Sequence, residues 1–350
     1  MERLRIAVAG AGVIGCRHIE EIAKCDATRL AAIVDPSPKA DDVARANGVP
    51  RFASLDDLMQ RVRLDGVIVA TPNAFHVEQA LACLAAGVPT LVEKPVSHTY
   101  ADGVRLCKAV ERSGAKLLVG HHRRHSPILR KAVSIVKSGE LGPIVAVMGS
   151  AVFYKPDTGY FDGVNAWRRQ PGGGPILINM IHEVDNLRAM VGEIVAVQAM
   201  ASSRTRGFEV EDTVAINLQF DNGALGTFLL SDTAASPKSW EQTSGENEAY
   251  ARCDDDDAYA IIGATGSLGV PTMRVRRYGS AQARSWFEPF QVRVEPVERQ
   301  DPLANQIAHF AQVIRGEAEP LVTCRDGLAN VRVTEAIAEA ARTQRRVDLA

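Results

Sequence analysis

The sequence predicts an α/β protein in which a doubly wound parallel sheet is followed by a second α/β domain with antiparallel strands. Short β-rich runs alternate with helical patterns from Leu4 to Gly120, and a glycine-rich turn follows the first run. A hairpin pattern with one apolar face appears much later, at residues 214–230. With 350 residues the chain exceeds the size at which one core usually keeps growing, so two domains are expected.

Five apolar runs predict the strands of the first domain. Consecutive apolar positions, as in Val67 to Val69, indicate that both faces of the sheet are covered, and strands separated by helices must be parallel. The runs are Leu4 to Ala9, Leu30 to Val34, Gly66 to Ala70, Thr90 to Val92 and Lys116 to Val119, and the clearest helices between them are Val77 to Ala86 and Tyr100 to Ser113.

After Gly120 the pattern becomes less regular. Apolar and polar residues alternate over residues 214–220, and Asp221-Asn222-Gly223 then turns the chain into Ala224 to Leu230, which predicts an antiparallel hairpin. The stretch Ser236 to Ala258 has little periodicity and is expected to form a long loop beside or over the cleft. The other expected elements are the helix Pro127 to Ser138, the strand Ile144 to Phe153, the helix Ile176 to Val191 after the loop Gly172-Gly173-Gly174, and the closing helices Pro302 to Arg315 and Asp326 to Arg342.

Composition and charge exclude several classes of protein. The net charge of -2 gives no electrostatic case for nucleic-acid binding, and no apolar stretch approaches the roughly 20 residues that cross a bilayer. The six scattered cysteines show no CxxC spacing, which indicates neither disulfides nor a zinc site. We expect a cytoplasmic protein without a metal ion, and Asp254 to Asp257 is interpreted as a solvated acidic turn in preference to a cation site.

A dinucleotide site is predicted at Gly10-Ala11-Gly12-Val13-Ile14-Gly15, between the first strand and the first helix. Gly10 permits a tight turn, Gly12 lets the backbone approach a pyrophosphate, and Gly15 allows close contact between helix and strand. Asp35, at the end of the second strand, can accept both adenosine ribose hydroxyls and would repel a 2'-phosphate, so NAD is favoured over NADP. The alternative is a glycine turn that binds no ligand.

Two further side chains are candidates for proton transfer. Lys94 follows the strand Thr90 to Val92 at the sheet edge where such folds bind ligands, and beside a cationic nicotinamide its pKa should be lowered. His182 belongs to a polar stripe, Asn179, His182, Asp185 and Asn186, on an otherwise apolar helix. The alternatives are a surface lysine that caps strand carbonyls and a histidine that only satisfies internal hydrogen bonds.

These motifs together resemble the Gfo/Idh/MocA oxidoreductases, the glucose-fructose oxidoreductase and inositol dehydrogenase family. The likeness spans nearly the whole chain, and the order and spacing of its motifs are specific. It is carried by the glycine turn, Thr71-Pro72-Asn73 with His76, Glu93-Lys94-Pro95, Gly172-Gly173-Gly174 with His182 and Asp185, and residues 263–268.

The resemblance implies an N-terminal Rossmann domain, residues 1–122, and a C-terminal substrate-binding and oligomerisation domain, residues 123–350, with a large, mostly antiparallel sheet. The C-terminal helix is expected to pack back on the first domain, and a homodimer or homotetramer is expected. Lys94 and His182 would be the catalytic pair. Near the cofactor it places Gly10, Gly12, Val13, Ile14, Gly15, Asp35, Thr71, Pro72, Asn73, His76, Glu93, Lys94 and His122, and near the substrate Arg123, Tyr160, Trp167, Asn179 and Asp185.

One departure from the family pattern concerns the substrate. Many sugar and polyol dehydrogenases of the family carry aspartate four residues before the histidine, where this chain has Ile178, with Asn179 one place along. One residue turns a side chain by about 100° around an α-helix, so Asn179 need not inherit that role. Trp240 and Glu241 are further candidates for the pocket lining, and Arg123 with Arg124 is alternatively a solvated pair.

The predicted activity is NAD-dependent hydride transfer to or from a sugar, a polyol or a related cyclic hydroxy compound. Two other functions stay open at this point. Relatives use tightly held NAD for transient oxidation during glycoside cleavage, and a regulatory protein could sense NAD without turnover. Net reduction of the cofactor separates the dehydrogenase from the glycoside-cleaving enzyme, whereas tight NAD binding without turnover of any substrate would favour the regulatory protein.

Overall fold

The computed structural model describes residues 2–280 and 284–349, which form two compact units. The first unit comprises residues 1–125 and 301–331, and the second comprises residues 126–300 and 332–350. The long helix α11 (Cys324–Thr343) begins in the first unit and ends in the second. Each unit contains its own sheet and is described by itself.

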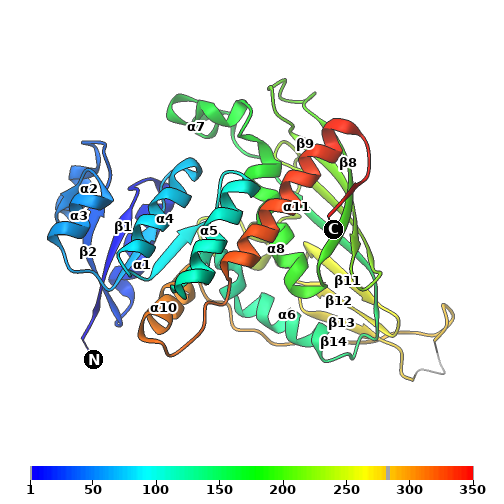
Figure 1. The fold of residues 1–350 in the computed structure, drawn as a ribbon. Coiled ribbons are helices and arrows are strands. Elements are labelled where there is room, and N and C mark those ends of the chain that lie inside the picture. The colour runs from blue at the N-terminus through cyan, green and yellow to red at the C-terminus, as the bar shows by residue number, and fades with distance from the viewer. Residues whose placement is uncertain (1, 281–283, 350) are drawn as a thin grey trace. The chain divides into compact units, whose positions relative to one another are not determined.

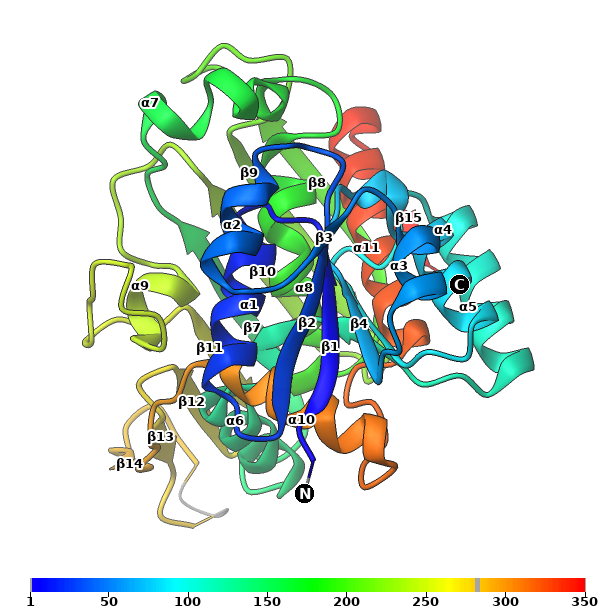
Figure 2. The same cartoon turned by 90° about the vertical axis from the view of Figure 1, so that its left-hand side faces the viewer.

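The first unit is built on a parallel sheet of six strands in the order β3-β2-β1-β4-β5-β6. Helices α1 and α10 contact one another on one side of it, while α3, α4 and α5 form the other layer (Figures 1 and 2). Its elements are β1 (Leu4–Ala9), α1 (Val13–Lys24), β2 (Thr28–Val34), α2 (Ala40–Ala46), β3 (Arg51–Phe52), α3 (Leu55–Arg61), β4 (Gly66–Val69), η1 (Asn73–Phe75), α4 (His76–Ala85), β5 (Thr90–Glu93), α5 (Tyr100–Ser113), β6 (Leu117–Gly120), η2 (His122–His125) and α10 (Pro302–Arg315).

Local sequence signals explain why several predicted helix boundaries are correct. The Thr99 hydroxyl caps α5 by accepting the Asp102 N–H at 3.2 Å, and Gly114 ends that helix with a φ of 63°. Asp301 caps α10 in the same way, and Pro302 occupies its first position. Strands β1, β4, β5 and β6 are almost completely buried, as their unbroken apolar runs predicted.

The second unit contains a sheet of nine strands in the order β14-β13-β12-β11-β7-β10-β9-β8-β15, and all neighbours are antiparallel except β7 and β10. The prediction of a large, mostly antiparallel sheet is therefore confirmed. The elements are α6 (Pro127–Lys137), β7 (Ile144–Val152), α7 (Asp157–Tyr160), η3 (Gly163–Arg169), the π-helix η4 (Ile176–Met180), α8 (Ile181–Met190), β8 (Ile194–Ser202), β9 (Thr213–Phe220), β10 (Leu225–Ser231), α9 (Trp240–Ser244), β11 (Tyr259–Gly263), β12 (Gly266–Val270), β13 (Arg274–Arg277), β14 (Gln291–Val294) and β15 (Val347–Asp348).

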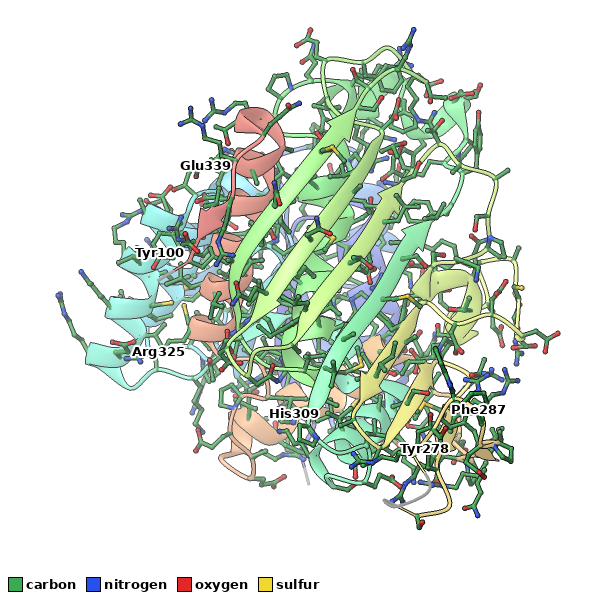
Figure 3. The ribbon with its side chains drawn as sticks, turned by 90° about the vertical axis from the view of Figure 1, so that its right-hand side faces the viewer. Tyr100, Tyr278, Phe287, His309, Arg325 and Glu339 are labelled. Carbon is green, nitrogen blue, oxygen red and sulfur yellow. The ribbon has the colours of Figure 1, made fainter. Side chains whose placement is uncertain are left out.

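The two faces of this sheet differ. Val214, Ile216, Leu218 and Phe220 of β9 are buried in one core with residues of α6, α8 and α11. Figure 3 looks onto the other face, where no helix in the described part of the chain covers the central strands. Exposed apolar side chains stand on this open face, among them Met148, Met200 and Leu229.

Two predictions about the secondary structure of the second unit are wrong. The stretch Ser236 to Ala258 is not only a loop, because it contains the short helix α9, capped by Ser239. Trp240 is 3% exposed, and its ring centroid lies 6.1 Å from that of Tyr259, so it belongs to the core. The predicted helix Ile176 to Val191 is also not uniform, since a π turn precedes its α-helical part.

Candidate functional site

Two glycines of the first turn are required by the fold itself. Gly10 has a φ of +94°, and a Cβ atom there would lie 2.5 Å from the carbonyl oxygen of Ala70. A Cβ atom on Gly15 would lie 1.9 Å from the carbonyl oxygen of Gly10. Both positions therefore exclude any side chain, because backbone atoms already occupy the space.

Gly12 is different, because nothing in the protein requires it. A Cβ atom at this position would meet no heavy atom within 4 Å. Gly12 is the N-cap of α1, makes no side-chain cap, and is followed by Val13, which is 85% exposed. An open space in front of an uncapped helix N-terminus fits the pyrophosphate of a dinucleotide.

Asp35 follows β2 and is fixed beside this turn. Its carboxylate accepts the Ala11 N–H at 2.9 Å and the Ser37 N–H at 2.8 Å. The guanidinium of Arg51 donates to the backbone carbonyl of Asp35 at 2.8 Å and is also bound by Asp41. Because β3 lies beside β2, Arg51 comes close to Asp35, a proximity that their sequence separation did not reveal.

The loop after β4 is held by His76. The two ring nitrogens of this buried histidine each lie 2.7 Å from a carbonyl oxygen, one of Thr71 and the other of Pro95. Burial lowers the pKa of His76, although both carbonyls favour the protonated form. The contacts join the loop after β4 to the loop after β5, while Pro72 and Asn73 are exposed.

Glu93 ends β5 and is paired with His18, a residue that the sequence reasoning missed. The Nε2 atom of His18 lies 2.8 Å from Oε1 of Glu93, and both side chains are buried. Burial alone would raise the pKa of Glu93, but His18, Lys94 and His122 lower it to about 2. Glu93 is therefore an anion, and a buried anion needs its partner.

Lys94 directly follows Glu93 in the sequence and is partly buried. Its backbone N–H donates to Oε2 of Glu93 at 3.1 Å, so the carboxylate fixes the backbone that carries the lysine. Nearby in the same unit, His122 and Arg123 belong to η2 after β6. Arg123 is 2% exposed, so the alternative of a solvated arginine pair is wrong for this residue.

In the second unit His182 and Asp185 lie in α8, and both are buried. Asn186, in contrast, donates to the Tyr259 hydroxyl at 2.9 Å, and that hydroxyl donates to Glu183. The predicted polar stripe therefore has two parts, because Asn186 belongs to a hydrogen-bond network within the core.

Asn179 lies in the π turn, three residues before His182. Its Oδ1 atom accepts a hydrogen bond of 2.6 Å from Nζ of Lys155, which is only 8% exposed. The comparison of Ile178 with Asn179 assumed α-helical spacing, which a π turn does not have. Lys155 could not be predicted from a sequence pattern, because its contact with Asn179 forms only in the folded chain after β7.

Tyr160 joins this group through its ring. The Lys155 ammonium lies 4.6 Å from the ring centroid, and the guanidinium of Arg168 lies 4.0 Å from it. Burial raises the pKa of Tyr160 to about 12, so its hydroxyl stays protonated near neutral pH. Trp167 is 48% exposed in η3, and Glu241 is partly buried in α9.

Metal and membrane features are absent from the part of the chain that the structure describes. Among residues 2–280 and 284–349, no group of three or more His, Cys, Asp or Glu side chains is placed to hold a metal ion. Within the same ranges, no helix has both the length and the apolar character of a membrane span. The carboxylates of the predicted acidic turn form ion pairs, Asp254 with Arg252 and Arg299 and Asp256 with Lys238.

Two family models match the chain. Residues 4–121 match the NAD-binding Rossmann fold of the oxidoreductase family GFO_IDH_MocA, and residues 133–349 match the C-terminal alpha/beta domain of the same family. The 1,5-anhydro-D-fructose reductase of Ensifer adhaerens is 27% identical over 87% of this chain and 86% of its own length. The rhizopine catabolism protein MocA of Rhizobium meliloti is 26% identical over 97% of this chain and 95% of its own length.

A solved structure is similar over the same length. The WlbA dehydrogenase from Bordetella pertussis, in complex with NADH and UDP-GlcNAcA, has a TM-score of 0.79 and is 26% identical. The alignment covers 100% of this chain and 99% of that one.

We predict that Gly12→Ala weakens NAD binding by about tenfold or more while the melting temperature stays unchanged. The added methyl group meets no protein atom but occupies the space that a pyrophosphate needs. Titration calorimetry with NAD and thermal unfolding measure the two effects. Gly15→Ala is the contrasting variant, because its clash with Gly10 should lower stability; unchanged NAD affinity in Gly12→Ala would contradict the assignment.

A second prediction concerns acid stability. Because the folded pKa of Glu93 is lowered from 4.5 to about 2, its contribution is present above pH 4.5 and is lost as the pH falls toward 2. Glu93→Gln should reduce the free energy of unfolding by roughly 3 kcal/mol at pH 7, and this difference should shrink by roughly 1 kcal/mol by pH 3.5. Urea unfolding across this pH range measures it; a difference that does not depend on pH would refute the ionised state.

Proposed function

The chain belongs to the Gfo/Idh/MocA family of NAD-binding oxidoreductases, and on this premise we propose that it transfers a hydride between NAD and a secondary alcohol or carbonyl of a sugar, a polyol or a related cyclic hydroxy compound. The relatives support this substrate class, since one reduces an anhydro sugar and the solved dehydrogenase holds a nucleotide sugar. The observation that carries the proposal is Lys94, fixed by a buried carboxylate at the end of β5.

In this proposal the first unit binds the cofactor. The N–H groups at Val13 and Ile14 would hold the pyrophosphate, and Asp35 would accept hydrogen bonds from the ribose hydroxyls. Thr71, Pro72, Asn73 and His122 would lie near the nicotinamide half, and His76 holds the loop that carries Thr71. When bound, NAD supplies the hydride acceptor.

The second unit would bind the substrate, with Asn179, Asp185, Tyr160 and Trp167 as contacts. Lys94 or His182 takes the hydroxyl proton as the alcohol is oxidised and returns it in the reverse reaction. Both groups suit this role, because amines and imidazoles exchange protons near neutral pH when their surroundings adjust their pKa.

We also propose that the open face of the nine-stranded sheet joins copies of the chain into a dimer or tetramer. Exposed apolar residues such as Met200 and Leu229 stand beside a shallow pocket of about 470 Å³ on this face. A cytoplasmic location is proposed as well, supported by the six cysteines, which are all free thiols.

Lys94→Ala should lower turnover by roughly 10² to 10⁴ while NAD affinity changes little, since proton transfer is lost but the glycine turn is intact. Reduction of NAD, followed by absorbance over a panel of sugars, polyols and lactones, measures turnover. Lys108→Ala, on the exposed surface of α5, is the matched control and should retain full activity. Equal activity of the two variants would refute the role of Lys94.

Met200→Glu should shift the chain toward the monomer, because an unpaired charge is costly in a packed interface. Light scattering after gel filtration gives the mass of each species. Glu248→Lys, an exposed charge change away from the sheet, is the control. A wild-type protein that is monomeric at micromolar concentration would contradict this proposal.

A further inference from the structure

We infer that the second unit contains an anion subsite formed by Arg168 and Lys155 around Tyr160, and that the substrate is therefore a sugar or polyol that carries a carboxylate, such as a uronic or aldonic acid. This inference rests on the proposed function, because it specifies the substrate of the same reaction. It depends on contacts within the second unit alone.

Arg168 is held by a backbone carbonyl and by two aromatic rings. Its Nη1 atom donates to the backbone carbonyl of Tyr160 at 2.9 Å, and its guanidinium lies against the rings of Tyr160 and Trp167, 4.0 and 5.6 Å from their centroids. Within residues 2–280 and 284–349 no acidic side chain forms an ion pair with it, and its buried Nε has no hydrogen-bond partner. A guanidinium has five N–H donors in a planar fork that suits a carboxylate, and among the described residues only the Tyr160 carbonyl accepts a hydrogen bond from that of Arg168.

Lys155 brings a second cation to the same ring. Its ammonium lies 4.6 Å from the Tyr160 centroid, is nearly buried, and donates to Asn179 at 2.6 Å. Lys155 also forms an ion pair with Asp232, whose carboxylate lies 3.8 Å from its ammonium. That carboxylate is shared, because Arg206 contacts it at 3.0 Å.

The nearby carboxylates are engaged by the other cations of this group. Asp157 and Asp232 both pair with Arg206, and Asp232 also lies 3.8 Å from Lys155. A bound carboxylate would be the first acidic partner of Arg168 among the described residues.

Two acidic residues on the adjoining segment accept hydrogen bonds from backbone N–H groups. Asp212 accepts the N–H groups of Thr205 and Arg206, each at 2.9 Å. Glu211 accepts the Ile176 N–H at 2.9 Å, and burial raises the pKa of Glu211, which lowers its tendency to carry charge. Neither of them forms an ion pair with Arg168.

The subsite is connected to the candidate catalytic segment. Lys155 is hydrogen-bonded to Asn179 in the π turn, three residues before His182. A neutral polyol would leave the donors of Arg168 unpaired in a partly desolvated position, and such unpaired groups give strong discrimination between substrates.

The test compares matched pairs of substrates, D-glucose with D-glucuronate and D-galactose with D-galacturonate, under saturating NAD. For the wild type we expect a higher kcat/KM with the acid of at least one pair. In Arg168→Gln the kcat/KM for that acid should fall about 30-fold or more, while that for the neutral sugar stays within about threefold. The kcat/KM of Arg168→Lys for the acid should lie between those of the wild type and Arg168→Gln, because lysine keeps the charge but lacks the planar set of N–H donors.

Arg169→Gln is the matched control, since this neighbouring exposed arginine rests on the ring of Phe208 and loses the same charge. Its preference for the acid should equal that of the wild type. Thermal unfolding of each variant separates loss of fold from loss of recognition. A wild type that prefers the neutral sugars, an equal loss for both members of a pair in Arg168→Gln, or stronger binding of sugar phosphates than of uronates would overturn the inference.

Calorimetric binding of the uronates to the NADH-loaded protein separates this inference from the proposed function. Uronate binding that depends on Arg168, without turnover, would keep the subsite and reject the dehydrogenase. Turnover of neutral polyols without any effect of Arg168 would keep the dehydrogenase and reject the subsite.

Discussion

The hydrogen bond between His18 and Glu93 joins the two parts of the first unit on which the proposed chemistry depends. His18 belongs to α1, whose N-terminus faces the open space at Gly12, and Glu93 ends β5, directly before Lys94. The carboxylate also accepts the Lys94 N–H, so one buried anion fixes the cofactor helix and the candidate catalytic backbone together. A substitution at His18 should therefore shift the backbone at Lys94, and a substitution at Glu93 should shift α1.

The second unit uses charge in another way. Its cations lie against aromatic rings, and two of them, Lys155 and Arg206, share the carboxylate of Asp232. Electrostatic preorganisation of this kind is most useful where a ligand completes the pairing. The two units thus contribute differently, one through backbone geometry around glycines and the other through side-chain charge.

Most of the first unit could be predicted from the sequence because its signals are local. The glycine turn, the buried strands and the capped helices each depend on neighbouring residues, and the bounds of β1, α5 and α10 agree with the structure. The missed features depend on distant contacts. His18 is separated from Glu93 by 75 positions, so no local pattern links the two residues. Strand β14 is exposed along its whole length, so it has no alternation of buried and exposed residues that would predict a strand. Asn179 could be named, but its partner Lys155 could not, because the contact arises only from the folded arrangement after β7.

The π turn at residues 176–180 has a consequence for how the substrate range can change. Such a turn contains one residue more than an α-helical turn, so deletion of a single codon within it would restore ordinary helix and place a different side chain where Asn179 now lies. His182 would keep its place in α8. New specificity in this chain can therefore arise from a change of helix length as well as from replacement of a side chain.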